Sequence, residues 1–213
     1  MPESQSAPTI QQFTVTALLF DQFDLLEVSG PLEMFGILPE HFNIQFVSQL
    51  GRPVASMQGP KLVADFSIYN SHKSDILLVP GGAGVEQAIT NTLLIDWLQQ
   101  QSNSANYICS VGTGAALLAQ AGVLKDKAAT TNKKRYRWVT GIGTDINWYP
   151  VARWVKDGRI FTSSGVSAGI DLSLAVIAQL LDEETARKTA IEAEYIWVND
   201  PSDDPFAPLH VVS

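Results

Sequence analysis

Three glycine-containing turns carry the residues of this chain that could take part in chemistry. Each turn comes just after a short apolar run, at the point where a buried strand would end. The first turn spans residues 26–31 and contains Glu27, the second is Val79-Pro80-Gly81-Gly82, and the third is Ser110-Val111-Gly112-Thr113-Gly114. Because ligands of open α/β sheets bind at the carboxyl ends of the strands, we expect the functional site at these turns.

The first two turns offer a carboxylate and a pair of accessible backbone amides. Glu27 lies among leucine and valine residues, so its carboxylate is either partly buried for a reason or turned outward. In the second case it would belong to an ordinary helix start, with Ser29 near the cap and Pro31 in the first turn. Gly81 and Gly82 permit positive φ and leave N–H groups that could hold an oxyanion or a carboxylate.

The third turn has the pattern of a nucleophile elbow without a nucleophile. A strand that enters a helix through glycines and small residues would lift the side chain of its apex residue above the sheet. Here the apex is Gly112, which has no side chain with which to attack. Cys109 is the only cysteine, and we place it inside the strand as a small buried hydrophobe. It excludes an intramolecular disulfide.

Neither a serine nucleophile nor a metal site is supported by the pattern. Ser110 and Thr113 have hydroxyl groups, but no motif places a histidine beside them. No two of the three histidines have the spacing of metal ligands, so we expect no metal. They fall in connecting or terminal segments, at His41, His72 and His210. The glycine spacing after Val79 does not match a dinucleotide fingerprint, and we expect no cofactor.

The elements that position these turns are short apolar runs that alternate with helical segments. Runs at residues 13–20, 44–47, 76–79, 107–111 and 128–131 predict strands buried on both faces. Helical spacing at 85–100, 113–121 and 168–181, and a final helix from residue 182 toward Tyr195, predict helices on both faces of a mostly parallel sheet. Asp157-Gly158 predicts an added β-hairpin near residues 151–162, and a second ribbon is expected near 54–64.

Composition indicates one globular domain with an acidic surface. The chain has 213 residues, 46% hydrophobic and 17% charged, with a net charge of −8. We assign residues 1–12 to a flexible tail, 13–198 to the domain and 199–213 to an extension along the surface. The charge argues against nucleic acid, and the basic residues 133–138 are interpreted as a solvated face. With no membrane span and no secretory signal, we expect a cytoplasmic protein.

Taken together, these motifs resemble the ThiJ/PfpI superfamily, the class I glutamine amidotransferase-like group that includes the parkinsonism-associated deglycase. The resemblance is strongest to its isocyanide hydratase branch and runs from about residue 13 to about residue 195, with further support from Ala129-Thr130-Thr131 and from residues 164–171. It implies a flavodoxin-like sandwich and a homodimer. It also implies a cysteine thiolate at the elbow with Glu27 as its partner, and an oxyanion site from the amides of Gly82 and Thr113.

Two departures from the family pattern change the expected function. Gly112 stands at the cysteine position, and Asn132 stands where many members have histidine. Covalent thiol chemistry needs an ionisable sulfur at the apex. We therefore expect a non-catalytic protein that binds a small polar metabolite among Gly81, Gly82, Gly112, Thr113, Asn132 and Gly165.

Two alternatives stay open at this stage. In one, Glu27 and a bound water carry out an isocyanide hydratase-like lyase or hydrolase reaction. In the other, Gly112 is an engineered replacement of the cysteine of such an enzyme. The second departure at Asn132 favours natural divergence over an engineered change. A third possibility is a dimer subunit whose surface matters more than its pocket.

Overall fold

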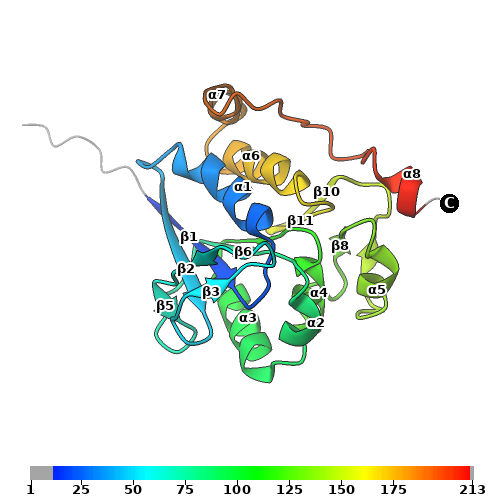
Figure 1. Cartoon of the computed structure of the whole chain (residues 1–213). Helices are drawn as coiled ribbons and strands as arrows, with labels where there is room; N and C mark the ends of the chain where they lie inside the picture. Colours follow the sequence, from blue (N-terminus) through cyan, green and yellow to red (C-terminus); the bar gives the residue numbers. More distant parts are fainter. Residues whose placement is uncertain (1–11, 212–213) are drawn as a thin grey trace, which may run out of the picture.

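A seven-stranded sheet forms the centre of the molecule in the computed structural model, which describes residues 12–211 (Figure 1). The strand order is β10-β11-β7-β6-β1-β2-β5. Neighbouring strands are parallel except β10 and β11, which form an antiparallel hairpin. The strands are β1 (Phe13–Leu19), β2 (Phe42–Ser48), β5 (Phe66–Ser67), β6 (Ile76–Val79), β7 (Tyr107–Ser110), β10 (Trp154–Asp157) and β11 (Ile160–Ser163).

Helices cover both faces of this sheet, which confirms the predicted flavodoxin-like sandwich (Figure 1). On one face, α1 (Leu25–Gly36) packs against α6 (Ala168–Leu180), and α6 packs against α7 (Glu183–Glu192). The other face carries α2 (Val85–Ala88), α3 (Thr92–Ser104) and α4 (Gly114–Gln120), and α5 (Tyr136–Thr140) packs beside α4. The short helix α8 (Ala207–His210) lies near the end of the chain. No helix within residues 12–211 is both long enough and apolar enough to cross a membrane.

The core lies between the sheet and its two helical layers. All four residues of β6 are fully buried, and so are Val15, Ala17 and Leu18 of β1. Strands that are apolar on both faces are the expected centre of a doubly covered parallel sheet. The predicted runs at 13–20, 44–47, 76–79 and 107–111 therefore correspond to strands of this sheet.

Both predicted ribbons are present, but one predicted strand lies elsewhere. The hairpin turns at Gly158, whose φ is +60°, and the second ribbon pairs β3 (Val54–Ala55) with β4 (Lys61–Leu62). The run at 128–131 contains only β8 (Ala128–Ala129), which pairs with β9 (Asn147–Trp148) outside the main sheet. Side chains of the β10–β11 hairpin bind the backbone of this run: the Ala128 N–H donates to Asp157, and the Thr130 N–H donates to Thr162.

Helix starts also differ from the prediction, for reasons of capping. The segment 85–100 is divided between α2 and α3, since the Asn91 side chain accepts the Leu94 N–H at 3.3 Å and caps a new helix. Helix α1 begins after Asp24 rather than near Ser29, so Pro31 lies inside the helix rather than in its first turn. Asparagine and aspartate are both strong N-cap residues.

The segment after α7 is held on α6 by the buried Asp171 carboxylate, which is also paired with Arg153. The Arg153 side chain donates to Asp171 Oδ2 through Nε at 2.9 Å and Nη2 at 2.6 Å, and the two side chains are 7% and 0% exposed. The second carboxylate oxygen of Asp171 accepts from the Tyr195 hydroxyl at 3.2 Å and from the Val198 N–H at 2.9 Å. Charge-assisted bonds from three directions hold this part of the chain on α6.

The extension after Val198 and the basic segment 133–138 lie mainly at the surface, as predicted, but each encloses one polar side chain. Asp204, expected on a surface extension, is 1% exposed and accepts a hydrogen bond from Ser164. Lys133, expected on a solvated basic face, is 3% exposed and donates to Thr130 Oγ1 at 2.8 Å and to the Ala152 carbonyl at 2.6 Å. The predicted tail, residues 1–12, lies outside the described residues except for Gln12.

Replacing Arg153 with leucine should destabilise the fold strongly. The change would leave the buried Asp171 carboxylate without its charged partner, which costs about 3–5 kcal/mol in comparable sites. The matched control is Arg187→Leu, which breaks the exposed pair with Glu183 on α7 and should cost below about 0.5 kcal/mol. Urea denaturation measures both free energies of unfolding, and equal losses would contradict the assigned role of Arg153.

Candidate functional site

The three glycine-containing turns meet at the carboxyl ends of β1, β6 and β7. Strand β1 leads into α1 on one face of the sheet, whereas its neighbour β6 leads into α2 on the other face. Adjacent strands whose connections leave toward opposite faces define the crevice where open α/β sheets bind ligands. The sequence-based prediction of the site's location is consistent with this topology.

Glu27 is brought into this crevice by the cap of its helix. Asp24 Oδ1 accepts the N–H groups of Leu26 at 3.0 Å and Glu27 at 3.3 Å, which fixes the first turn of α1. The Asp24 N–H in turn donates to the Gly81 carbonyl at 2.8 Å. Glu27 is 3% exposed, and its Oε2 accepts the Gly81 N–H at 2.5 Å. The choice that the sequence left open is thereby decided in favour of a buried carboxyl group.

Burial makes Glu27 a weak acid. Loss of hydration raises the pKa of its carboxyl group, the Gly81 hydrogen bond lowers the pKa, and the nearby Asp24 charge raises it, with a result of about 8. Glu27 is therefore mostly protonated at neutral pH. Since Oε2 accepts from Gly81, the carboxyl group can act as a donor through Oε1.

Gly112 lies directly against this carboxyl group in the predicted elbow between β7 and α4. Its φ is +55°, in the left-handed region that favours glycine. A Cβ atom built on Gly112 would lie 2.2 Å from Glu27 Oε1, so any side chain would require Glu27 to move. The Gly112 carbonyl accepts the Thr131 hydroxyl at 2.9 Å. The backbone prediction for the elbow is confirmed, and the carboxyl group of Glu27 occupies the place of the missing side chain.

The expected pair of oxyanion donors is only partly available. The Gly82 N–H donates to Thr113 Oγ1 at 3.1 Å, and the Gly81 N–H is used by Glu27. A Cβ atom built on Gly81 would lie 2.6 Å from the Thr113 nitrogen, which shows how closely these two turns approach. The site therefore brings Glu27, Gly81, Gly112 and Thr113 together, with Gly82 holding the Thr113 side chain.

Asn132 and Gly165 lie farther toward the outside. Both are half-buried, after β8 and β11 respectively. The Asn132 side chain is used within its own loop, where Oδ1 accepts the Arg135 N–H at 3.1 Å. A Cβ atom at Gly165 would meet no atom within 4 Å, so this glycine borders open space. The bond from Thr131 to the Gly112 carbonyl brings the Asn132 loop beside the site, whereas no hydrogen bond within residues 12–211 joins Gly165 to Glu27 or Gly112.

The lone thiol is remote from this chemistry. Cys109 lies inside β7 and is fully buried, as the sequence predicted, and burial raises the pKa of its thiol to about 12. A buried thiol of high pKa supplies no thiolate. Sequence reasoning missed two residues that position the site, Asp24 and Thr131. Asp24 could have been found as an aspartate directly before an apolar helical segment, which is a cap signal.

This fold and site define an open α/β protein with a strand-to-helix elbow at the carboxyl edge of its sheet. A glycine stands at the apex of the elbow, and a buried glutamic acid lies against it. The chain belongs to the DJ-1/PfpI family, whose sequence model matches residues 14–179. It is 33% identical to isonitrile hydratase from Pseudomonas putida over 179 residues, which cover 84% of this chain and 76% of that protein.

Two further proteins are similar to most of this chain. The chain is 26% identical to the HTH-type transcriptional regulator GbdR of Pseudomonas aeruginosa strain UCBPP-PA14 over 90% of its own length, but it matches only 53% of that regulator. Among solved structures, a ThiJ/PfpI family protein from Pseudomonas syringae has a TM-score of 0.80 and 29% identity, with 97% of this chain and 84% of that chain covered.

Gly112→Ala should cost more stability than the same change at another left-handed glycine. We expect a loss of about 2–4 kcal/mol, because the methyl group adds an overlap with Glu27 to the backbone cost. Gly158→Ala is the matched control, since its φ is +60° and nothing lies within 4 Å of its Cβ position. It should lose only about 1–2 kcal/mol. Chemical denaturation measures the free energy of unfolding of both variants and of Gly112→Ala combined with Glu27→Ala. The comparison gives the part of the loss that is due to the contact with Glu27.

The combined variant separates the two causes of the Gly112 cost. Without the Glu27 side chain, the added penalty of Gly112→Ala should fall to that of Gly158→Ala, since only the backbone conformation still opposes the methyl group. Equal penalties for Gly112→Ala and Gly158→Ala in the parent protein would show that Glu27 does not press on this position.

Glu27 should make the folded state less stable as the pH rises from about 5 to 8. In this window the folded protein, with its pKa of about 8, keeps a proton that the unfolded chain releases near 4.5. The unfolded state thus binds fewer protons, and the Glu27 contribution to stability falls by up to about 1.4 kcal/mol per pH unit. This loss of stability is absent below about pH 5 and complete above about pH 8.

The measurement is the difference in unfolding free energy between Glu27→Gln and the parent protein across that range. The amide cannot ionise, so the difference should shift in favour of the variant with each step in pH. Glu33→Gln, an exposed glutamate on the same helix, controls for removing a carboxylate from α1. A pH-independent difference for Glu27→Gln would mean that its carboxyl group titrates alike in both states.

Proposed function

We propose that this protein binds a small polar metabolite at Glu27, Gly112 and Thr113 and does not catalyse a thiol-dependent reaction. The observation that carries the proposal is the buried carboxyl group of Glu27, which lies against a residue without a side chain and accepts the Gly81 N–H. Burial raises its pKa to about 8, which favours the neutral acid. A neutral acid in an enclosed site is a hydrogen-bond donor, and it pairs best with a carbonyl or other acceptor on the ligand.

The arrangement opposes the covalent route of cysteine-containing relatives. The apex residue offers no nucleophile, and the thiol of Cys109 is fully buried in β7. Because the carboxyl group of Glu27 lies against Gly112, a ligand that contacts Gly112 requires the Glu27 side chain to turn aside. Gly82 is half-buried, so its backbone is partly accessible to a ligand.

A second candidate is hydration of an isonitrile without a thiol, favoured by the 33% identity to isonitrile hydratase. In this reaction the Glu27 proton would move to the terminal carbon of the isonitrile, giving a nitrilium ion. Water would add to that carbon and return one proton to the Glu27 carboxylate, and tautomerisation would give the N-substituted formamide. The raised pKa suits Glu27 to donate the first proton.

N-methylformamide and methyl isonitrile serve as probes to distinguish the two functions. At about ten times its dissociation constant, N-methylformamide should raise the melting temperature of the parent protein by roughly 3 °C. Glu27→Leu should lose this shift because its side chain has no donor, while Glu33→Gln should keep it. Methyl isonitrile should be converted to N-methylformamide no faster than without protein.

Other outcomes would revise the proposal in defined ways. Conversion that is abolished by Glu27→Gln and kept by Cys109→Ser would establish hydration by Glu27. Conversion abolished by Cys109→Ser would overturn the claim that the thiol is inactive. An N-methylformamide shift that persists in Glu27→Leu would move the ligand site away from Glu27.

A further inference from the structure

The ribbon of β3 and β4 lies directly beside the start of helix α1. Residues 56–60 connect its two strands, and we call them the ribbon turn. Phe23, in the segment that leads from β1 to α1, forms a bridge with Ser56 of this turn on one side and with Gly82 on the other. The Met57 N–H donates to the Phe23 carbonyl at 2.9 Å. The ribbon turn is thus a direct neighbour of the segment that caps α1.

The side-chain amide of Gln58, in the ribbon turn, completes this cap. Its Oε1 accepts the Leu25 N–H at 3.0 Å, and its Nε2 donates to Asp24 Oδ2 at 3.0 Å. The other oxygen of Asp24 accepts the N–H groups of Leu26 and Glu27. The first four N–H groups of a helix have no partner within the helix. In α1 the first three are taken by two side chains that also bond to each other.

These bonds fix the orientation of the Asp24 carboxylate. One oxygen faces the helix and the other faces Gln58, so a single orientation satisfies both. Asp24 is 9% exposed, which leaves little room for water to replace the amide. A mostly buried acceptor without a partner costs free energy. Without Gln58, the carboxylate would therefore gain by turning toward water, and its bonds to α1 would weaken.

The ribbon turn holds Gln58 in a closed conformation. The N–H and the hydroxyl of Ser56 both donate to the Pro60 carbonyl at 2.9 Å, and the Gly59 N–H donates to the Ser56 carbonyl at 3.0 Å. Gly59 has a φ of +104°, which glycine adopts without strain. A side chain carried by such a turn can support a neighbouring group with little loss of conformational freedom.

The position of Glu27 is sensitive to small movements of this first turn. Its Oε2 lies 2.5 Å from the Gly81 nitrogen, and its Oε1 lies against Gly112. Both contacts are close, so a shift of α1 by a fraction of an ångström changes them. Groups that must be held this closely depend on the side chains that support them.

We propose that Gln58 is a positioning residue for the Glu27 site and acts through Asp24. The amide holds the carboxylate, and the carboxylate holds the turn that carries Glu27. The consequence for ligand affinity rests on the function proposed above, whereas the positioning role does not. In the alternative, the backbone bonds of the ribbon alone place the cap, and Gln58 is an ordinary surface side chain.

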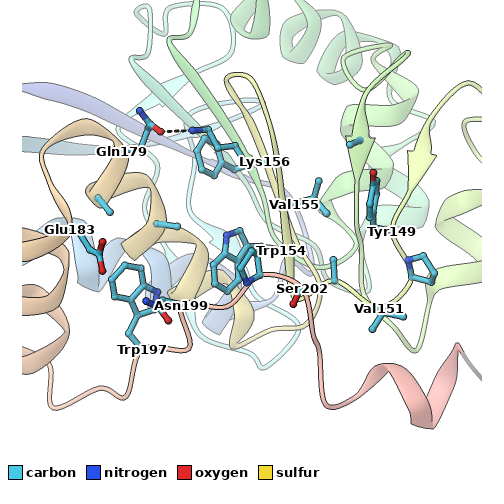
Figure 2. Close-up of a pocket in the computed structure, with 17 residues that line it drawn as sticks. Tyr149, Val151, Trp154, Val155, Lys156, Gln179, Glu183, Trp197, Asn199 and Ser202 are labelled. Carbon is cyan, nitrogen blue, oxygen red and sulfur yellow. Dashed lines mark hydrogen bonds between the residues drawn. The ribbon is translucent and has the colours of Figure 1, made fainter.

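Gln179 provides a matched control in another part of the molecule (Figure 2). Like Gln58 it is exposed, and its side-chain amide accepts a hydrogen bond from Lys156. It lies on α6 at a hollow of about 890 Å³ beside β10. The lining of that hollow includes neither Glu27 nor Asp24.

The test follows the carboxyl carbon of Glu27 by carbon-13 NMR across pH, with its signal assigned by loss in Glu27→Gln. In Gln58→Met we expect the pKa of Glu27 to fall by at least about one pH unit, because a less restrained turn admits water to the carboxyl group. Gln179→Met should leave this pKa unchanged. Both methionine variants lose one exposed amide and should melt within about 3 °C of each other.

Asp24→Ser tests whether Gln58 acts through Asp24. Serine still caps the helix but has no second oxygen for Gln58. In this background, adding Gln58→Met should move the pKa of Glu27 by less than about 0.3 pH units. The proposal is overturned by an unchanged pKa in Gln58→Met, by an equal change in Gln179→Met, or by a full effect in the Asp24→Ser background.

The affinity for N-methylformamide separates this proposal from the proposed function. Gln58→Met should raise the dissociation constant at least about threefold. If the pKa shifts as expected and the parent protein does not bind N-methylformamide, the proposed function fails and the positioning role stands. If the parent protein binds it and the pKa is unchanged in Gln58→Met, the positioning role fails and the proposed function stands.

Discussion

The contact between the Glu27 carboxyl group and Gly112 is the constraint on which the rest of the site depends. A side chain at position 112 and the observed position of Glu27 exclude one another, because a Cβ atom would lie 2.2 Å from Oε1. The Asp24 cap fixes the first turn of α1, and from this turn Glu27 reaches the Gly81 N–H. Burial in this position keeps the carboxyl group neutral, and a neutral carboxyl group costs less free energy to bury than a carboxylate does.

Much of the frame could be predicted from sequence because it follows from local patterns. Apolar runs gave the buried strands, Asp157-Gly158 gave the hairpin, and small residues around Gly112 gave the elbow. Tertiary partners decided what local patterns could not. The N–H groups at Ala128 and Thr130 bond to hairpin side chains, and Lys133 is enclosed by oxygens that no periodicity reveals.

The sequence predicted which residues form the site better than it predicted their burial and hydrogen bonds. Its location and the positive φ of Gly112 follow from the turns, but the burial of Glu27 was undecided because one carboxylate among apolar residues fits either orientation. The Gly82 amide was assigned to an oxyanion, and the structure gives it to Thr113. A family resemblance predicts which residue stands at a position, but it does not predict the hydrogen bond that the residue makes. The homodimer, the small-molecule ligand and the absence of a nucleic-acid partner stay predictions.

Arg153 joins segments that lie far apart in the sequence. Its carbonyl accepts the N–H of Ser164, which follows β11, and its N–H donates to the Pro201 carbonyl in the segment after α7. Its guanidinium is held by Asp171 of α6 with both side chains enclosed. Such an anchor fixes how these segments lie on the sheet. It does not by itself transmit an effect from one site to another, because coupling requires an element with two arrangements, and a buried ion pair of this kind favours a single arrangement.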